Sequence, residues 1–165
     1  MWEGKFIAAK RRGKWEYVSR SRGIRAAVIL AIDKDHVLLV EQYRVPLGKN
    51  CIELPAGLVG DHDDNSDEDA SLAATRELEE ETGYHADIMK DCGEFYSSPG
   101  MVSESFSMFK ADDLTKVSDG GGVEGENITV HRVALSELSA FIEQKRQEGA
   151  GIDVKILMLL WANLI

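Results

Sequence analysis

A group of glutamates in the middle of the chain has the residue type and spacing of a metal-binding site. It lies in the stretch RELEEETG, residues 76–83. On a helix, Glu81 lies about 40° and Glu80 about 60° from Glu77 around the axis, so these carboxylates share one side. Like charges this close repel each other, and the negative end of the helix dipole adds to the repulsion. A hard divalent cation would turn the repulsion into attraction, and such oxygen-rich sites select Mg²⁺ or Mn²⁺. A solvated charged face is the alternative, and it explains Glu79 but not the convergence of the others.

The composition is that of one acidic globular domain. The chain has 165 residues, 44% of them hydrophobic, and 19 basic against 29 acidic residues give a net charge of −10. This charge argues against nucleic acid or anionic membranes as partners. Cys51 and Cys92 are too few for a disulfide framework and lack the spacing of a zinc site. Residues 1–17 lack the hydrophobic stretch of a cleavable signal, and the apolar run 154–165 is shorter than the ~20 residues of a membrane crossing. We therefore expect a soluble, cytoplasmic protein.

The elements that must position the glutamates alternate between strands and helices. An acidic loop at residues 61–69 precedes a helix that is predicted from Ser66 or Asp67 to Thr82 and stops at Gly83. Two short strands around a basic turn at 10–13 are predicted for residues 5–20. Further strands are predicted at 24–33, 36–44, 51–59, 93–98, 103–111 and 127–135, and closing helices at 135–149 and 152–164. This order predicts a mixed sheet with helical layers, of the α/β or α+β class.

The glutamate helix resembles the signature of the Nudix family, G-x5-E-x7-R-E-U-x-E-E-x-G-U, in which U is a bulky apolar residue. The match runs without gaps from Glu68 through Arg76 to Tyr84. Ten residues rather than five separate Gly57 from Glu68, which indicates an insertion in the loop between them. The resemblance implies a Nudix fold, an α/β/α sandwich with a mixed sheet and an N-terminal antiparallel strand pair. It also implies hydrolysis of a nucleoside diphosphate linked to another group X.

The same resemblance implies roles for the residues of the signature. The implied metal ligands are Glu77, Glu81, a shared or bridging Glu80, and the carbonyl oxygen of Ala56. Arg76 and Glu68 would orient these glutamates without binding the metal themselves. Arg76 and Glu80 are also candidate catalytic residues. Mg²⁺ is the expected cofactor, with Mn²⁺ as the alternative.

Residues 38–59 are similar to one branch of the family, the ADP-ribose pyrophosphatases. Pro99 lies fifteen residues beyond Tyr84, where that branch carries its marker proline. The likeness implies substrate-binding roles for Arg44, which would contact the diphosphate, for Phe6, Trp15 and Arg20 around the base, and for Glu53 and Pro99. In the family the N-terminal piece, here residues 1–22, crosses to a second subunit and completes its site. A homodimer follows from the resemblance, with 23–165 as the hydrolase domain.

Hydrolysis of a diphosphate also needs a group that takes a proton from the attacking water. The glycine-rich loop at residues 118–126 offers two carboxylates on a segment that could close over substrate. Glu126 lies where related enzymes have their base and is the first candidate, with Glu124 the second. An ordinary acidic hairpin is the alternative.

The predicted reaction is hydrolysis of ADP-ribose or a related nucleoside diphosphate sugar to a nucleoside monophosphate and a sugar phosphate. A broader enzyme that also accepts sugars such as GDP-mannose is the main alternative. A non-catalytic nucleotide-sugar sensor is disfavoured because the signature glutamates are all present.

A calcium-binding EF-hand loop that starts at Asp61 is excluded by the sequence. Ser66 stands where such a loop needs glycine, and Leu72 stands where it needs glutamate.

Overall fold

The computed structural model describes residues 1–21, 24–60 and 69–161, and it confirms the predicted mixed sheet between helical layers. The strands are β1 (Ile7–Arg12), β2 (Trp15–Arg20), β3 (Arg25–Asp33), β4 (His36–Arg44), β5 (Lys49–Glu53), β6 (Ala56–Val59), β7 (Tyr84–Tyr96), β8 (Ser105–Lys116), β9 (Thr129–Ala134) and β10 (Gly151–Ile152). The helices are α1 (Ala70–Thr82), α2 (Leu138–Gln147) and α3 (Met158–Trp161), with 3₁₀ turns η1 (Val45–Leu47), η2 (Leu135–Glu137) and η3 (Val154–Leu157). The division into residues 1–22 and 23–165 stays a prediction.

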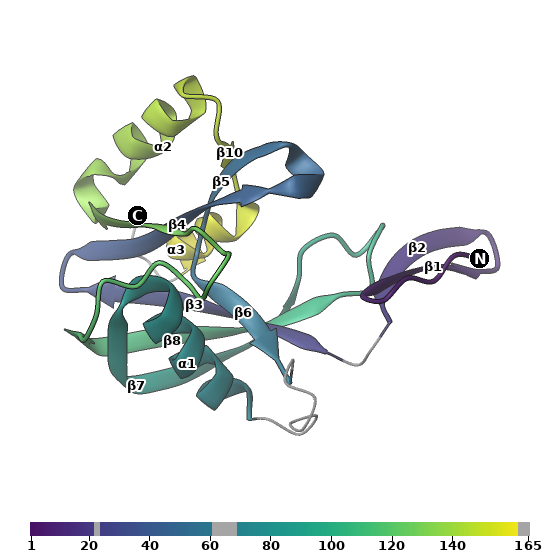
Figure 1. Cartoon of the computed structure of the whole chain (residues 1–165), viewed down its shortest axis with the longest axis horizontal. Coiled ribbons are helices and arrows are strands. Elements are labelled where there is room, and N and C mark those ends of the chain that lie inside the picture. The colour runs from purple at the N-terminus through teal and green to yellow at the C-terminus, as the bar shows by residue number, and fades with distance from the viewer. Residues whose placement is uncertain (22–23, 61–68, 162–165) are drawn as a thin grey trace.

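The main sheet opens in its middle, where β3 and β4 diverge. The strand order is β10-β5-β4-β3-β8-β7, with β6 also pairing with β3 and β9 with β4. β3 pairs with β4 only beside their turn, from Ile32 opposite Val37 to Asp33 opposite His36. Farther from this turn, β4 pairs with β5 and β3 pairs with β6 instead of with each other (Figure 1). The sheet therefore splits into two halves that are joined at one end.

The chain crosses between these halves at Leu54 and Pro55, so the single strand predicted at residues 51–59 is wrong. Glu53 is paired with Val40 of β4, whereas Ala56 is paired with Val28 of β3. Pro55 has no N–H to offer a ladder, and its carbonyl instead accepts from the N–H of Ile29 at 2.8 Å. The sequence run is thus two strands, β5 and β6, that belong to different halves of the sheet.

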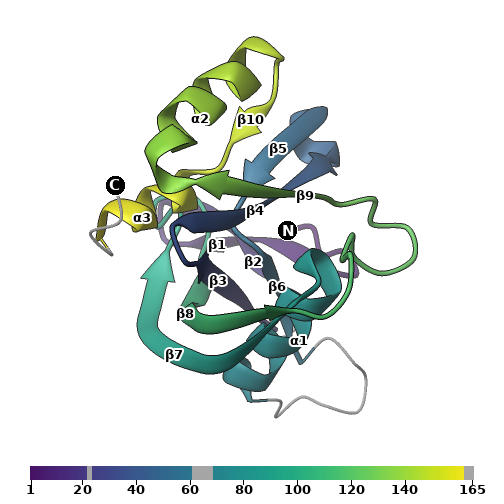
Figure 2. The same ribbon diagram turned by 90° about the vertical axis from the view of Figure 1, so that its left-hand side faces the viewer.

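The sheet buries both of its faces, as its continuous apolar strands require. Along β3, Val28 and Leu30 point to one side and Ala27 and Ile29 to the other, and all are at most 1% exposed. The first side packs against the C-terminal elements, with the buried side chains of Leu138, Ile156 and Leu159. The second side packs against α1, with the buried side chains of Ala73, Ala74 and Leu78. Figure 2 shows α1 and α2 at opposite ends of the molecule with the strands between them.

Helix α1 ends where the sequence predicts and begins a few residues later. Asp69 has an extended backbone, and its side chain accepts from the N–H groups of Ser71 at 2.8 Å and Leu72 at 3.3 Å. This N-cap defines the helix start at Ala70, and the predicted start at 66 or 67 falls outside the described residues. The helix ends at Gly83, whose left-handed backbone at φ 76° stops it as expected.

Two other predictions of element boundaries are corrected. The strand predicted at residues 93–98 is the end of β7, which begins at Tyr84 and pairs with β8 for most of its length. Most of its side chains are exposed or half-buried, so it lacks the strict alternation by which strands are recognised. The helix predicted at 152–164 is instead a short strand, a 3₁₀ turn and α3, of which residues 162–165 lie outside the description.

The predicted N-terminal strand pair is confirmed as the hairpin of β1 and β2, whose turn is Gly13 and Lys14 rather than residues 10–13. It projects away from the body of the molecule (Figure 1). Its backbone meets the body through Val18, whose N–H donates to Met101 at 2.9 Å and whose carbonyl accepts from Ser103 at 3.0 Å. Of the described helices, none is long and apolar enough to cross a membrane. A cytoplasmic location stays a prediction.

The burial of α1 predicts a large cost for truncating Leu78. Leu78 is fully buried, whereas Leu72 of the same helix is 67% exposed. We expect Leu78→Ala to lower the free energy of unfolding by about 2–5 kcal/mol, because it removes a packed side chain and leaves a cavity. The matched variant Leu72→Ala should change it by less than about 0.5 kcal/mol. Urea unfolding of both variants tests this packing, and equal losses would contradict it.

Candidate active site

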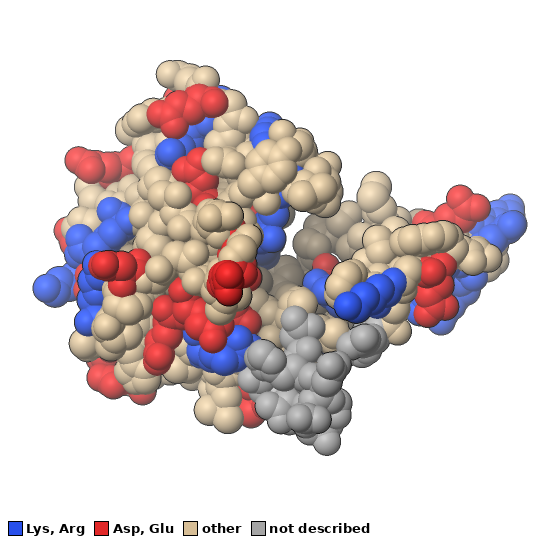
Figure 3. All heavy atoms as spheres, in the orientation of Figure 1, with Lys and Arg blue, Asp and Glu red and all other residues tan. Residues whose placement is uncertain are grey.

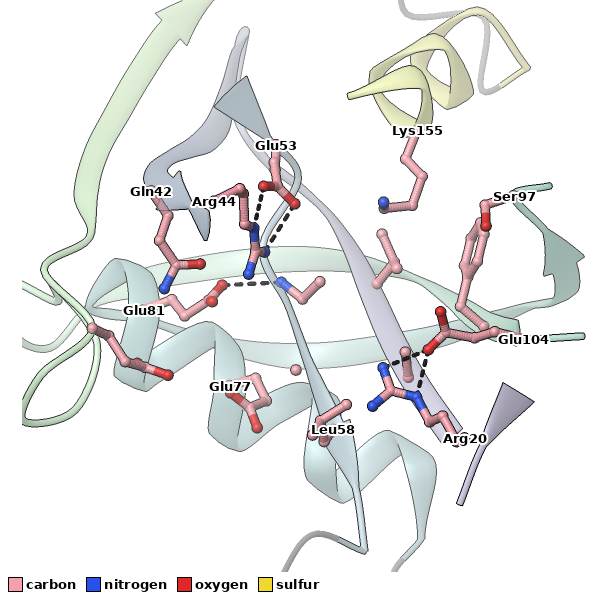
Figure 4. A pocket seen from close by; sticks show the side chains of 16 residues that line it. Arg20, Gln42, Arg44, Glu53, Leu58, Glu77, Glu81, Ser97, Glu104 and Lys155 are labelled. Atoms are coloured by element: carbon pink, nitrogen blue, oxygen red, sulfur yellow. Dashed lines mark hydrogen bonds and ion pairs between the residues drawn. The ribbon is translucent and has the colours of Figure 1, made fainter. Parts of the chain in front are cut away.

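A pocket of about 500 Å³ occupies the opening between the two halves of the sheet. The strands contribute Val28, Gln42, Arg44 and Glu53, and α1 contributes Glu77 and Glu81. Glu126 and Lys155 reach the same pocket from segments much later in the chain. Figure 3 shows acidic side chains gathered over α1, and Figure 4 shows Lys155 across the pocket from Glu77 and Glu81. The pocket thus brings acidic and basic groups together from segments that are far apart in the sequence.

Glu81 and Glu53 are the two buried acids that line the pocket, and each is 6% exposed. Glu81 lies at the end of α1. Its Oε2 accepts from the N–H of Ala56 at 2.9 Å, so β6 and the helix are joined at this point. Burial is the main cause that raises the pKa of Glu81 to about 8; the Ala56 N–H opposes the rise, and the negative charges of Glu77 and Glu126 add to it. The described contact of Ala56 with the site is through its N–H, and metal ligation by its carbonyl oxygen stays a prediction.

Arg76 lies between two glutamates of the helix and the neighbouring strand. Its Nη1 is 3.0 Å from Glu77 Oε1 and 3.1 Å from Glu80 Oε2, and its Nη2 is 3.5 Å from the carbonyl oxygen of Leu58. Burial raises the pKa of Glu77, Arg76 opposes the rise, and Glu80 adds to it. Arg76 is therefore placed to orient the acids, whereas Glu80 turns toward Arg76 and does not line the pocket.

Gly57 allows strand β6 to approach the helix at Glu77. A Cβ atom added at this position would lie 1.9 Å from Glu77 Cδ and 2.2 Å from its Oε1. No side chain fits there, so the carboxylate rests directly against the backbone of β6. This contact gives a physical reason for a glycine at the start of the predicted signature.

The glycine-rich loop between β8 and β9 is fastened to the end of α1. The N–H groups of Gly121 and Gly122 donate to the carbonyl oxygens of Glu81 and Glu80, each at 2.9 Å. These carbonyls belong to the last helical turn, which has no helical partner for them. The first part of this loop is therefore anchored to the helix, and closure of the loop over bound substrate stays a prediction.

The two carboxylates of this loop differ in position. Glu126 lines the pocket, and its negative charge raises the pKa of both Glu77 and Glu81. Glu124 does not line the pocket, although both side chains are exposed. The geometry thus favours Glu126, the first of the two predicted candidates, because it shares the pocket with Glu77 and Glu81.

Each cation that lines the pocket is held by an acid. Arg44 makes two parallel contacts with the buried Glu53, from Nε to Oε1 at 2.6 Å and from Nη2 to Oε2 at 3.0 Å (Figure 4). Glu53, predicted to bind substrate, thus contacts Arg44. The other two pairs are Arg20 with Glu104 at 2.6 Å and Lys155 with Asp153 at 2.6 Å.

Several lining residues are absent from the set predicted from the sequence, and the polar ones are Gln42, Ser97, Glu104 and Lys155. Gln42 could have been found, because it lies two positions before Arg44 on a strand and therefore shares its face. Lys155 gave no signal, since it stands alone in the apolar run at the end of the chain.

Some predicted substrate residues are not brought to this pocket within one chain. Phe6 and Trp15 are 65% and 67% exposed on the hairpin. Pro99 shares a separate hollow of about 260 Å³ with Trp15 and Tyr17, at the hairpin's contact with the body. Their roles with substrate stay predictions, and the orienting residue Glu68 lies outside the described residues.

The donor set of the pocket fits a hard divalent cation. Glu77 and Glu81 both line the pocket. Burial and the negative charge of neighbouring glutamates raise the pKa of each, so the anionic form of each is destabilised. Within residues 1–21, 24–60 and 69–161, no three acidic, His or Cys side chains already surround one point. Mg²⁺ is often bound by only one or two carboxylates, with water and substrate phosphates completing its shell. Two glutamates that line one pocket are therefore sufficient protein ligands for such an ion.

Comparison with known proteins agrees with this geometry. Residues 22–153 match the family model of the NUDIX domain. The GDP-mannose pyrophosphatase of Cronobacter sakazakii is 36% identical over 158 residues, which cover 90% of this chain and 76% of that protein. The ADP-ribose pyrophosphatase of Bacillus subtilis is 32% identical over 120 residues, which cover 72% of this chain and 62% of that protein. The crystal structure of an ADP compounds hydrolase aligns with a TM-score of 0.63 at 22% identity, over 83% of this chain and 80% of that one, which shows a shared fold.

The raised pKa of Glu81 predicts how the stability of the metal-free protein depends on pH. Its pKa rises from 4.5 to about 8 on folding, so between these values the folded protein holds a proton that the unfolded chain releases. Stability should fall as pH rises through this range, and Glu81→Gln should remove that fall because an amide stays neutral. The melting temperature in EDTA should thus rise more in this variant at pH 8 than at pH 5. Glu143→Gln, at an exposed position on α2, should show no such trend, and a pH-independent effect of Glu81→Gln would contradict the assignment.

Proposed function

Because this chain belongs to the Nudix hydrolase family, we propose that it hydrolyses the diphosphate bond of nucleoside diphosphate sugars with the help of Mg²⁺. The products are a nucleoside monophosphate and a sugar phosphate. ADP-ribose is the first candidate substrate, and a broader range that includes GDP-mannose is the alternative. The observation that carries the proposal is one pocket that is lined by Glu77 and the buried Glu81 and also by the cationic side chains of Arg44 and Lys155. Two relatives, named for ADP-ribose and for GDP-mannose, support the substrate class.

The charges of the pocket suit a diphosphate. Arg44 and Lys155 supply two cationic groups, and Arg44 is held in a fixed orientation by its double contact with Glu53. A planar guanidinium can donate to two oxygens of a phosphate. The chain as a whole is acidic, with a net charge of −10, so these local cations must attract the substrate.

The reaction needs charge neutralisation, a positioned water and a proton acceptor. Glu77 and Glu81 would hold Mg²⁺, which would supply positive charge to the phosphates and lower the pKa of a bound water. Arg44 donates to the diphosphate oxygens and orients the bond to be broken. Arg76 keeps Glu77 in position, and Glu126 takes a proton from the attacking water through its carboxylate oxygen. Mn²⁺ is an alternative ion, because it accepts the same oxygen ligands.

We place the nucleoside base beside aromatic residues of a second subunit. Phe6 and Trp15 are exposed on a hairpin that projects from the body, where they could stack on a base belonging to a neighbouring site. This supports a homodimer with exchanged N-terminal segments, in which Arg20 and the loop of Pro99 lie near the junction. A cytoplasmic location is part of the same proposal.

A substrate panel in ¹⁸O-labelled water tests the function. With Mg²⁺, we expect hydrolysis of ADP-ribose or other nucleoside diphosphate sugars, with the label in one of the two phosphate products. Glu77→Gln should abolish this activity, because one of two facing carboxylates is lost. Preference for ADP-ribose would support the narrower substrate range, and comparable rates with GDP-mannose the broader one. No release of phosphate products from any member of the panel, with Mg²⁺ or Mn²⁺, would overturn the proposal.

The two loop carboxylates can be separated by matched variants. Glu126→Gln should reduce kcat by about 10² to 10⁴-fold and leave KM nearly unchanged, because it removes the proton acceptor and keeps the shape. Glu124→Gln, two positions away and outside the pocket, should retain kcat. Steady-state rates over a range of pH provide the comparison, and wild-type kcat in Glu126→Gln would reject its role as the base.

A further inference from the structure

The carboxylate of Glu126 folds back over the backbone of its own loop. Its Oε2 accepts from the N–H of Val123 at 2.9 Å. A Cβ atom added at Gly122 would lie only 2.4 Å from this Oε2 and 2.9 Å from Glu126 Cβ. The space that the carboxylate occupies is thus available only because residue 122 has no side chain.

We propose that Gly122 is a positioning residue, which seats the Glu126 carboxylate and links it to the helix that carries Glu77 and Glu81. This inference rests on the proposed role of Glu126 as the base. Gly122 has contacts on two sides: its N–H donates to the carbonyl oxygen of Glu80 at 2.9 Å, and its Cα faces Glu126. The adjacent N–H of Gly121 donates to the carbonyl oxygen of Glu81 at the same distance.

The link runs through backbone atoms and therefore does not depend on the side chains that meet substrate. Two hydrogen bonds join the loop to the last turn of α1, and the Val123 N–H joins the loop to the carboxylate. The separation between the base and the buried acids is set by this short path. A displacement of about 1 Å at a reacting group can reduce a rate by about 10²-fold, so a shift of this seat should be visible in kcat.

Gly125 provides a control within the same loop. Both glycines have left-handed backbones, with φ of 80° at Gly122 and 96° at Gly125. An added Cβ atom would meet nothing within 4 Å at Gly125, in contrast to its collision with Glu126 at Gly122. Alanine at either position introduces comparable backbone strain, but only at 122 does it displace the carboxylate.

The experiment compares Gly122→Ala and Gly125→Ala, each in the wild-type and in the Glu126→Gln background, in the full-length protein with Mg²⁺. We expect Gly122→Ala to lower kcat by roughly 10- to 100-fold with little change in KM, and Gly125→Ala to retain kcat within about threefold. In the Glu126→Gln background, Gly122→Ala should cause no further loss, because the group that it displaces is already absent. Melting temperatures and Mn²⁺ binding by calorimetry check that both variants fold and keep the acidic site.

The outcomes separate the two levels of the proposal. If Glu126→Gln lowers kcat but Gly122→Ala does not, the positioning role fails and the function stands. Equal losses in the two alanine variants, or an additive loss in the Glu126→Gln background, would show a general effect of loop strain and also overturn it. If Glu126→Gln keeps wild-type kcat, the role of the base fails first. Should Gly122→Ala not fold, Val123→Pro, which deletes the N–H donor to Glu126, must lower kcat by a similar factor for the inference to stand.

Discussion

The placement of like charges close together in one pocket is the constraint on which this structure depends. Burial raises the pKa of both Glu77 and Glu81, and the negative charge of Glu126 raises both further. Arg76 and the N–H of Ala56 offset part of this cost, and the opening between β3 and β4 provides the space. The fold therefore maintains a site that is unfavourable by itself and that a divalent cation with an anionic ligand would stabilise.

The basic groups of the pocket show the opposite arrangement. Arg44, Lys155 and Arg20 each contact an acid outside the glutamate helix, so their charges are balanced before substrate arrives. Such pairs hold long side chains in defined orientations and reduce the entropy lost on binding. The bond between substrate phosphates and these cations must then compete with an existing partner. We expect this competition to increase the specificity of binding more than its affinity.

The sequence contained enough information for the acidic half of the site and for the general fold. The spacing of Glu77 and Glu81 placed both on one helix face, and Gly83 marked the helix end, since both features depend on local geometry. The split of residues 51–59 between two strands was not foreseen, because it depends on the divergence of β3 from β4. Lys155 was missed for a similar reason, because a single lysine can be assigned to the pocket only once the C-terminal segment is known to pack beside it. Local patterns thus define individual elements, whereas the position of Lys155 in the pocket depends on contacts between distant segments.

The attachment of α1 at its carboxyl end affects which parts of the chain can change in length without loss of the site. Both the backbone of Ala56 and the loop of Gly121 hold the final turn, whereas the opposite end begins at the Asp69 cap after a chain segment five residues longer than the family pattern. Because the reactive end has its own anchors, length changes before the cap need not disturb it. The connection between β6 and α1 is therefore a natural place for insertions, through which related enzymes could diversify without rebuilding their chemistry.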